Sequence, residues 1–276
     1  MDFRADLHMH SYFSDGSNSP QELLYLAKEK KLSAISITDH DTIDAYDDKL
    51  FEIANKLDIK LLVGSEISSQ LFNKTVHILA YGIELHSKSF KIFLEKLWEK
   101  RRDRNIQILK KLSIKNIDIS ESDLIEFSRK INISKTVLGR VHIAKLMIEK
   151  GYVKTLNEAF DEYIKDDGPC FVMGDRFAPK EVIDQIHMAN GKAILAHPNV
   201  IKSSRVIASL LEHDFDGIEV YYAKLYPMHE KKWLKIAEKK NLIASGGSDF
   251  HGTVKPFITI GCSWVDEKTF NKIICK

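Results

Sequence analysis

Residues 6–16 read DLHMHSYFSDG, and they overlap a strand that the apolar pattern predicts over Phe3–His8. His8 and His10 stand two positions apart at its end. In an extended strand such residues point to the same side, so both imidazoles can reach one ion. A lone pair of histidines is weak evidence, because unrelated surface or core histidines produce the same pattern. The rest of the chain decides whether this stretch begins a metal-binding fold.

Short apolar segments alternate with amphipathic ones in both end regions of the chain. After Phe3–His8, the segments predicted to be strands are Ser33–Thr38, Lys60–Val63, Thr75–Tyr81, Ala193–Ala196, Gly217–Tyr222 and Leu242–Gly246. The segments predicted to be helices are Pro20–Lys31, Ala45–Leu57, Pro179–Ala189, Val206–Glu212 and Pro227–Lys239. Strands that alternate with helices in this way are typical of an α/β protein with a parallel sheet or barrel.

The middle of the chain has a different pattern. From about Phe90 to about Asp175 it is helical and charged, without a convincing strand. Its predicted helices are Phe90–Leu112, Ser120–Arg129, Arg140–Lys150 and Thr155–Lys165. We interpret this region as a helical insertion that covers the substrate. The first part of the barrel is then residues 1–88, the insertion is residues 89–178, and the second part is residues 179–276.

The composition excludes several classes of protein. The chain has 276 residues, of which 44% are hydrophobic and 29% charged, and its formal net charge is +2. This length allows one large α/β domain, or one domain with an insertion. The balanced charge argues against a strongly basic surface that binds nucleic acid. We therefore expect no stable partnership with duplex nucleic acid.

The cysteines and the N-terminus indicate the compartment. Cys170, Cys262 and Cys275 are few and far apart, which argues against a disulfide framework and a thiolate zinc site. The first residues, MDFRADLHMHS, contain no apolar signal core. No apolar run reaches the roughly 20 residues that span a bilayer. We expect a cytoplasmic protein without a membrane partner.

Histidines and carboxylates recur near the ends of the predicted strands. Besides His8 and His10, they are Asp15, Asp39, His40, Asp41, Glu66, His77, His197, Asp249 and His251. All follow or end a predicted strand except His77, which lies within Thr75–Tyr81. In parallel α/β barrels the carboxyl ends of the strands carry the active site. Random placement would not produce this pattern, so we predict that these side chains converge.

The types of ligand indicate metal ions and a phosphate substrate. Imidazole and carboxylate suit Zn, Mn or Fe rather than Ca. Leaving out Asp39 and Asp41, these residues supply nine ligands, which at three or four per ion correspond to two or three ions. Two ions about 3.5–4 Å apart bind and activate the oxygens of a phosphoryl displacement. We predict a metal-dependent phosphoesterase in which a metal-bridging water is deprotonated near neutral pH and attacks phosphorus.

At these residues the chain resembles the PHP (polymerase and histidinol phosphatase) family. The motifs DLHMHSYFSDG, ITDHD, GSE, VHIL, AHP and GGSDFHG match the family's metal motifs in order. The resemblance covers about residues 1–85 and 190–255. It implies a distorted (β/α)7 barrel, with a trinuclear metal site at the carboxyl ends of its strands.

The resemblance also implies how the ligands are shared. By ion, they are His8, His10, Glu66 and Asp249; then Asp15, His40 and His251; then His77 and His197, with Glu66 as a bridge. Three of them, Asp15, His40 and His197, are our candidates for catalytic residues. His197 or a metal-bound water is the candidate general acid. Asp39 is expected to orient its neighbours.

Two motifs of the insertion narrow the substrate class. KRRDRN (residues 100–105) and LGRVHIAK (residues 138–145) resemble the insertion of PHP phosphoesterases that act on nucleotides. The residues expected to bind substrate are Arg101, Arg102, Arg104, Asn105, Gly139, Arg140 and His142. Arginine forks match phosphate oxygens bidentately. The branch often reads GRPHIAR, and Val141 and Lys145 replace its proline and arginine here.

We therefore predict a phosphoric monoester hydrolase with three divalent ions (Mn, Zn or Fe) and a small phosphorylated substrate. The expected substrates are AMP-like 5'-monophosphates or 3',5'-nucleotide bisphosphates. Three alternatives stay open: release of 5' nucleotides from short RNA, hydrolysis of histidinol phosphate, and a catalytically idle metal-binding module that docks other proteins. Idle modules usually lose ligands, whereas all nine positions are filled here.

Overall fold

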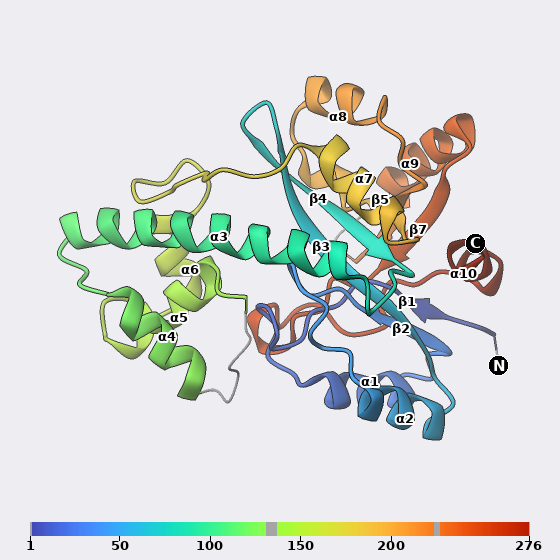
Figure 1. The fold of residues 1–276 in the computed structure, drawn as a ribbon, viewed down its shortest axis with the longest axis horizontal. Coiled ribbons are helices and arrows are strands. Elements are labelled where there is room, and N and C mark those ends of the chain that lie inside the picture. Colours follow the sequence, from blue (N-terminus) through green and yellow to red (C-terminus); the bar gives the residue numbers. More distant parts are fainter. Residues whose placement is uncertain (1, 131–136, 224–226, 276) are drawn as a thin grey trace. The chain divides into compact units, whose positions relative to one another are not determined.

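The computed structural model describes residues 2–130, 137–223 and 227–275. Its strands form one seven-stranded sheet in the order of the sequence (Figure 1). They are β1 (Ala5–Asp6), β2 (Ala34–Ile37), β3 (Lys60–Leu71), β4 (Lys74–Tyr81), β5 (Lys192–Leu195), β6 (Gly217–Tyr222) and β7 (Ile243–Gly247). Past β1, Met9 forms a parallel bridge with Phe250 beyond β7. The sheet therefore nearly closes on itself, which confirms the predicted α/β barrel.

The distortion of the barrel lies at β4. This strand is antiparallel to both β3 and β5, whereas the other neighbouring strands are parallel. The predicted end of the third strand at Val63 was wrong, because β3 continues to Leu71. Residues 64–71 continue the strand because their backbone groups pair with β4. Glu66 consequently lies inside β3 and not after it.

The first strand is shorter than predicted. Beyond Asp6, the chain leaves the ladder, and the Asp6 carboxylate accepts hydrogen bonds from the backbone amides of His8, Ser248 and Gly261. Helix α2 (Asp48–Lys56) also begins later than the predicted Ala45, because the Asp47 side chain caps it by accepting from Leu50 N at 2.7 Å.

Helices surround the barrel and bury its outer face. They are α1 (Pro20–Glu29), α2, α7 (Pro179–Met188), α8 (Ser204–Leu210), α9 (Pro227–Lys240) and α10 (Glu267–Ile274). Helix α1 begins with a capping box between Ser19 and Glu22 and buries Leu23 and Leu24. Helix α10 was not predicted; its Phe270 and Ile273 pack in the core cluster that includes Ala5 and Val265.

The contacts divide the chain into two compact units, residues 1–94 with 177–276, and residues 95–176. The predicted insertion boundaries at 89 and 178 lie outside the second unit. Helix α3 (Lys88–Ile114) enters this unit, which also holds α4 (Glu121–Lys130), α5 (Arg140–Glu149) and α6 (Leu156–Ala159). The predicted helix Thr155–Lys165 is instead α6 followed by one π turn, Phe160–Ile164. Ile108, Leu112, Ile143 and Met147 are buried in the core of this unit.

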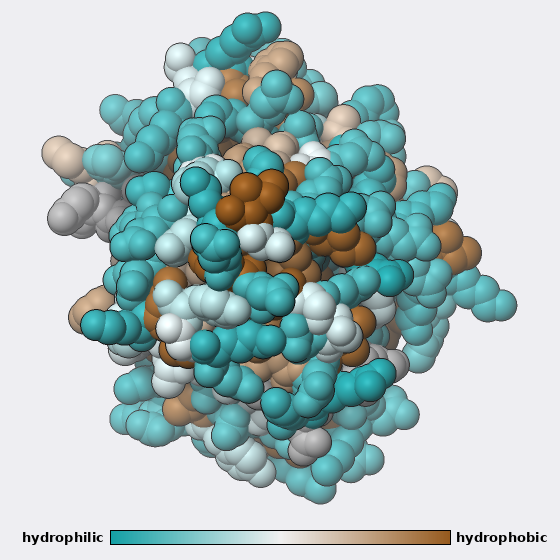
Figure 2. Space-filling model, turned by 90° about the vertical axis from the view of Figure 1, so that its left-hand side faces the viewer, coloured by the Kyte–Doolittle hydropathy of each residue, from teal (hydrophilic) through white to brown (hydrophobic). Residues whose placement is uncertain are grey.

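Hydrophilic residues cover most of the face shown in Figure 2, and the hydrophobic residues on it form small separate groups. Every helix within the described ranges is too short or too polar to cross a bilayer.

Candidate metal centre

The structure brings together all nine side chains that the sequence predicts as metal ligands. Each contacts another member through nitrogen and oxygen atoms 2.8–3.8 Å apart. Seven come from the segments after β1, β2, β5 and β7, while Glu66 lies in β3 and His77 in β4. Because β4 runs antiparallel, its beginning lies at the same edge as the carboxyl ends of the parallel strands. This is why His77 joins the cluster from inside a strand.

Glu66 is the centre of the cluster. Its Oε1 atom lies 2.8 Å from both His77 Nδ1 and His197 Nε2. Its Oε2 atom lies 3.3 Å from His8 Nε2, 3.1 Å from His10 Nε2 and 3.3 Å from His40 Nδ1. One buried carboxylate therefore faces five imidazoles.

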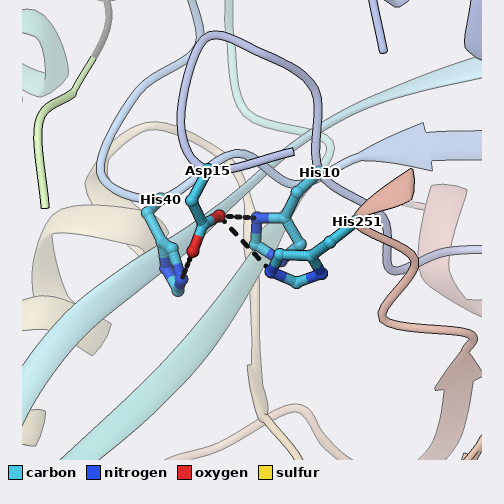
Figure 3. Close-up of side chains that lie close together, drawn as sticks. All are labelled: His10, Asp15, His40 and His251. Carbon is cyan, nitrogen blue, oxygen red and sulfur yellow. Dashed lines mark ion pairs between the residues drawn. The ribbon is translucent and has the colours of Figure 1, made fainter. Parts of the chain in front are cut away.

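Asp15 contacts three imidazoles of the cluster, those of His10, His40 and His251 (Figure 3). Its Oδ1 atom lies 3.3 Å from His251 Nε2 and 3.6 Å from His10 Nδ1, and its Oδ2 atom lies 3.8 Å from His40 Nε2. Donor atoms of His10, Asp15, His40 and His251 all lie within 4.8 Å of one another. Two further groups meet the same limit: His8, His10 and Glu66, and His40, Glu66 and His77.

Asp249 closes the cluster on the side of β7. Its Oδ1 atom lies 3.4–3.6 Å from nitrogens of His8, His10 and His251. Its Oδ2 atom points away from these imidazoles and accepts hydrogen bonds from the Tyr222 hydroxyl at 2.8 Å and the Lys255 ammonium at 2.7 Å. Neither Lys255 nor Tyr222 was predicted to have a role in the site.

Two buried carboxylates, those of Glu219 and Asp39, hold the imidazoles of His8 and His10 on the side away from Glu66. Glu219 Oε1 lies 2.8 Å from His8 Nδ1, and Glu219 Oε2 accepts from the His197 backbone amide at 2.6 Å. Asp39 accepts from the Ser14 hydroxyl at 2.6 Å, and Ser14 Oγ lies 3.3 Å from His10 Nδ1. Carboxylates in such positions fix the rings of metal-bound histidines. Asp39 thus lies where an orienting residue was expected, whereas Glu219 was missed.

Electrostatics keep the three carboxylate ligands and His40 in forms that suit metals. Burial raises the pKa of a carboxyl group, but the imidazoles of His77, His40 and His8 hold the pKa of Glu66 well below its usual value. The pKa of Asp15 and of Asp249 is also well below the usual value. Burial lowers the pKa of His40 to about 3, so its imidazole is neutral at pH 7, which is the form that binds metals.

The unsatisfied atoms at the centre fit divalent ions. Among the described residues, buried ring nitrogens without a hydrogen-bond partner include His8 Nε2, His10 Nε2, His40 Nδ1 and His197 Nδ1. Buried polar atoms in folded proteins almost always have a partner. Imidazoles and ionised carboxylates at these spacings are the donor set of Zn, Mn and Fe. The residues therefore fit the predicted metals.

The residues predicted to bind substrate lie in the helical unit, where several of them contact one another. Asn105 Nδ2 donates to Leu138 O at 3.0 Å, and Arg104 Nη2 donates to Asn105 Oδ1 at 2.8 Å. Gly139 N donates to His142 Nδ1 at 3.1 Å. A methyl group on Gly139 would lie 3.1 Å from Arg101 Nη1.

Arg102 and Arg140 are engaged elsewhere in that unit. Arg102 pairs with Glu121. Arg140 donates to Asp166 Oδ1 at 2.6 Å and to Ile164 O at 3.1 Å. Each would have to leave a carboxylate to bind a phosphate.

A cavity of about 420 Å³ lies beside these residues in the helical unit. Its lining is mainly apolar, with Trp98, Ile106, Leu124 and Leu138 among the contributors. Arg101, Arg102 and Asn105 also line it, together with the carboxylates of Glu95, Glu99 and Glu121.

The chain matches a model of the PHP domain over residues 6–258. The 5'-3' exoribonuclease Rnm of Salmonella typhimurium is 30% identical over 262 residues, which cover 93% of this chain and 87% of that protein. The 3',5'-nucleoside bisphosphate phosphatase of Chromobacterium violaceum is 28% identical over 253 residues, which cover 89% of this chain and 86% of that protein.

Solved structures show the same fold. A protein from Bifidobacterium adolescentis, described as a metal-dependent phosphoesterase, has a TM-score of 0.87 at 27% identity and covers 98% of this chain and 95% of its own. With the barrel and its cluster of imidazoles and carboxylates, this defines the class of the protein, a metal-dependent phosphoesterase. The chain belongs to the PHP domain family, as its motifs predicted.

Proposed function

We propose that this phosphoesterase hydrolyses small nucleotides, either AMP-like 5'-monophosphates or 3',5'-nucleoside bisphosphates, at a centre of three divalent ions. The contact of Glu66 with five imidazoles carries the proposal. A carboxylate with both oxygens among ligand nitrogens is placed to bridge ions, and the remaining ligands group around it on either side. Nine ligands at three or four per ion, with one shared, suit three ions.

Each part of the chain has a separate task in this proposal. Bound Mn, Zn or Fe would supply Lewis acidity toward the phosphate and acidify a water molecule. In hydrolysis, the oxygen of water bonds to phosphorus, the ester P–O bond breaks, and the leaving oxygen takes a proton. Asp15, His40 and His197 remain our candidate catalytic residues. Glu219 and Asp39 keep the rings of His8 and His10 in place.

The cavity in the helical unit supports a nucleotide as the substrate. Its lining is mainly apolar, and its three carboxylates lie beside the guanidinium groups of Arg101 and Arg102, so it suits the uncharged ring of a nucleobase. Trp98 lines the cavity, and stacking of a base on an aromatic ring contributes about 1–3 kcal/mol. We therefore propose that Trp98 recognises the base, and that Arg101 and Arg104 serve the polar parts of the substrate.

The test is phosphate release by the Mn²⁺-loaded protein from AMP, adenosine 3',5'-bisphosphate, histidinol phosphate and p-nitrophenyl phosphate. We expect the two nucleotides to have the highest kcat/KM. Glu66→Gln should abolish release from every substrate. Trp98→Ala should raise KM for the nucleotides about 5- to 140-fold, as loss of one stacked base implies, and leave KM for p-nitrophenyl phosphate unchanged. Activity confined to histidinol phosphate would refute the nucleotide assignment.

A second candidate substrate is the 5' end of short RNA. Relatives from Salmonella typhimurium and from Haemophilus influenzae, 30% and 28% identical, are named 5'-3' exoribonucleases. A 5'-phosphorylated RNA of a few nucleotides separates the two activities. Release of mononucleotides from the 5' end supports the exonuclease, whereas release of inorganic phosphate from an otherwise intact chain supports the phosphatase.

A further inference from the structure

The two oxygens of Asp249 have different surroundings. Oδ1 faces the imidazoles of His8, His10 and His251 at 3.4–3.6 Å. Oδ2 is bound on the other side by the Tyr222 hydroxyl at 2.8 Å and the Lys255 ammonium at 2.7 Å. A carboxylate oxygen held by a hydroxyl and an ammonium is not available to a metal. The Asp249 side chain can therefore offer only Oδ1 to the centre.

The two groups on Oδ2 come from separate parts of the barrel. Tyr222 ends β6 and is buried, and its ring lies 5.6 Å from that of His197. Lys255 follows the short helical turn Gly252–Val254 and keeps 29% of its side chain exposed. A charge-assisted bond at 2.7 Å to a carboxylate that is 6% exposed is among the stronger hydrogen bonds of a protein.

The backbone of Asp249 has an unfavourable conformation that its contacts must stabilise. Its φ is +55°, in the left-handed region that a residue with a side chain adopts at a cost of about 1–3 kcal/mol. Residues persist there when surrounding contacts determine their conformation. The Asp249 amide donates to His8 O at 2.7 Å, and the side chain is held by Tyr222 and Lys255.

We propose that Lys255 is a positioning residue of the metal centre, and that with Tyr222 it restricts Asp249 to one-oxygen binding of the ion that His8 and His10 share. This inference rests on the proposed role of Asp249 as a ligand. Removing the ammonium leaves Oδ2 with one partner, so the carboxylate can rotate and Oδ1 no longer keeps a fixed position. Outer-shell changes of this kind typically weaken metal affinity about 10- to 100-fold.

The experiment compares Lys255→Met, Lys255→Arg and Tyr222→Phe with the unchanged protein. Each metal-free protein is titrated with Mn²⁺ against a fluorescent chelator, and bound Mn²⁺ is counted after dialysis. We expect Lys255→Met to bind Mn²⁺ about 10- to 100-fold more weakly, Tyr222→Phe to show a smaller loss, and Lys255→Arg to restore most of the affinity. Lys240→Met is the matched control, because Lys240, like Lys255, bonds a carboxylate, that of Glu212, and it also donates to the Leu211 carbonyl.

Two further measurements separate positioning of the ligand from folding and from substrate binding. Thermal melting of the metal-free variants reports folding; a lowered melting temperature with unchanged Mn²⁺ affinity would mean a merely structural Lys255 and overturn the proposal. A higher KM with unchanged Mn²⁺ affinity would instead make Lys255 a substrate ligand, and would overturn it too. If the unchanged protein binds none of Mn²⁺, Zn²⁺ and Fe²⁺, the proposed function itself fails; if it binds Mn²⁺ and Lys255→Met binds it equally well, only this inference fails.

Discussion

His8 Nδ1 lies 2.8 Å from Glu219 Oε1, a contact between residues 211 positions apart. Both side chains are fully buried. The bond fixes which nitrogen of His8 faces the other ligands, because Nδ1 is occupied by Glu219 and Nε2 is directed toward Glu66 and Asp249. Glu219 also accepts from the backbone amide of His197, so one carboxylate orients two members of the cluster.

Glu219→Gln should weaken metal binding while preserving the shape of the side chain. The amide has one acceptor oxygen, so it can serve His8 or His197 but not both, and its NH₂ group faces a donor. We expect Mn²⁺ affinity to fall about 10- to 100-fold, measured by competition with a chelator. Glu230→Gln, on the first turn of α9, is the control and should keep the affinity of the unchanged protein. Equal affinities in both variants would contradict the role of Glu219.

Removal of divalent ions should lower the stability of the protein. The cluster places ionised carboxylates among buried imidazoles, and an ion that binds only the folded state stabilises it by mass action. At a concentration 100 times the dissociation constant, this amounts to about 2.7 kcal/mol per site. We expect EDTA to lower the melting temperature and added Mn²⁺ to restore it.

Variants of single histidines test whether the stabilisation by Mn²⁺ comes from the candidate metal centre. His8→Ala and His40→Ala should lose most of the Mn²⁺-dependent shift in melting temperature. His187→Ala should keep it in full, because His187 bonds Asp216 at 2.8 Å and contacts no member of the cluster among the described residues. A full shift in His8→Ala would count against a metal centre at this position.

The sequence predicted the nine candidate metal ligands better than it predicted the residues that orient them. Strand-end positions pointed to most of the nine, because the carboxyl ends of parallel strands converge. Glu66 and His77 lie within strands: Glu66 lies where β3 continues past its pairing with β2, and the antiparallel course of β4 brings His77 to the same edge. Glu219 left a signal in the sequence, a lone acid between Ile218 and Val220 of an apolar strand. No signal in the sequence pointed to Lys255, because its contact with Asp249 depends on the conformation of the loop between the two residues.

The Asp123 carboxyl group of the helical unit should stay ionised at a lower pH than an ordinary aspartate. Hydrogen bonds from the Ser120 backbone and hydroxyl, with the Lys150 ammonium nearby, lower the pKa of Asp123 to about 2. A depressed pKa means that its contribution to stability is present above the ordinary value of 3.8 and is lost as pH falls from there toward 2. Carboxyl ¹³C shifts between pH 3 and 7 should show Asp123 still ionised at pH 3.8. Half-protonation at that pH would contradict the capping contact.

Tyr46→Phe should destabilise the barrel near the metal centre. The Tyr46 hydroxyl lies between β2 and β3, where it accepts from Ile37 N at 2.9 Å and Gly64 N at 3.0 Å and donates to Ile37 O at 2.7 Å. Without it, two buried amides lose their acceptor, at a cost of about 1–3 kcal/mol each. Urea denaturation of the metal-free protein measures the loss in the free energy of unfolding. Tyr25→Phe is the control: Tyr25 is 57% exposed, so its variant should stay within about 0.5 kcal/mol of the unchanged protein. An equally small effect of Tyr46→Phe would show that water replaces the hydroxyl between the strands.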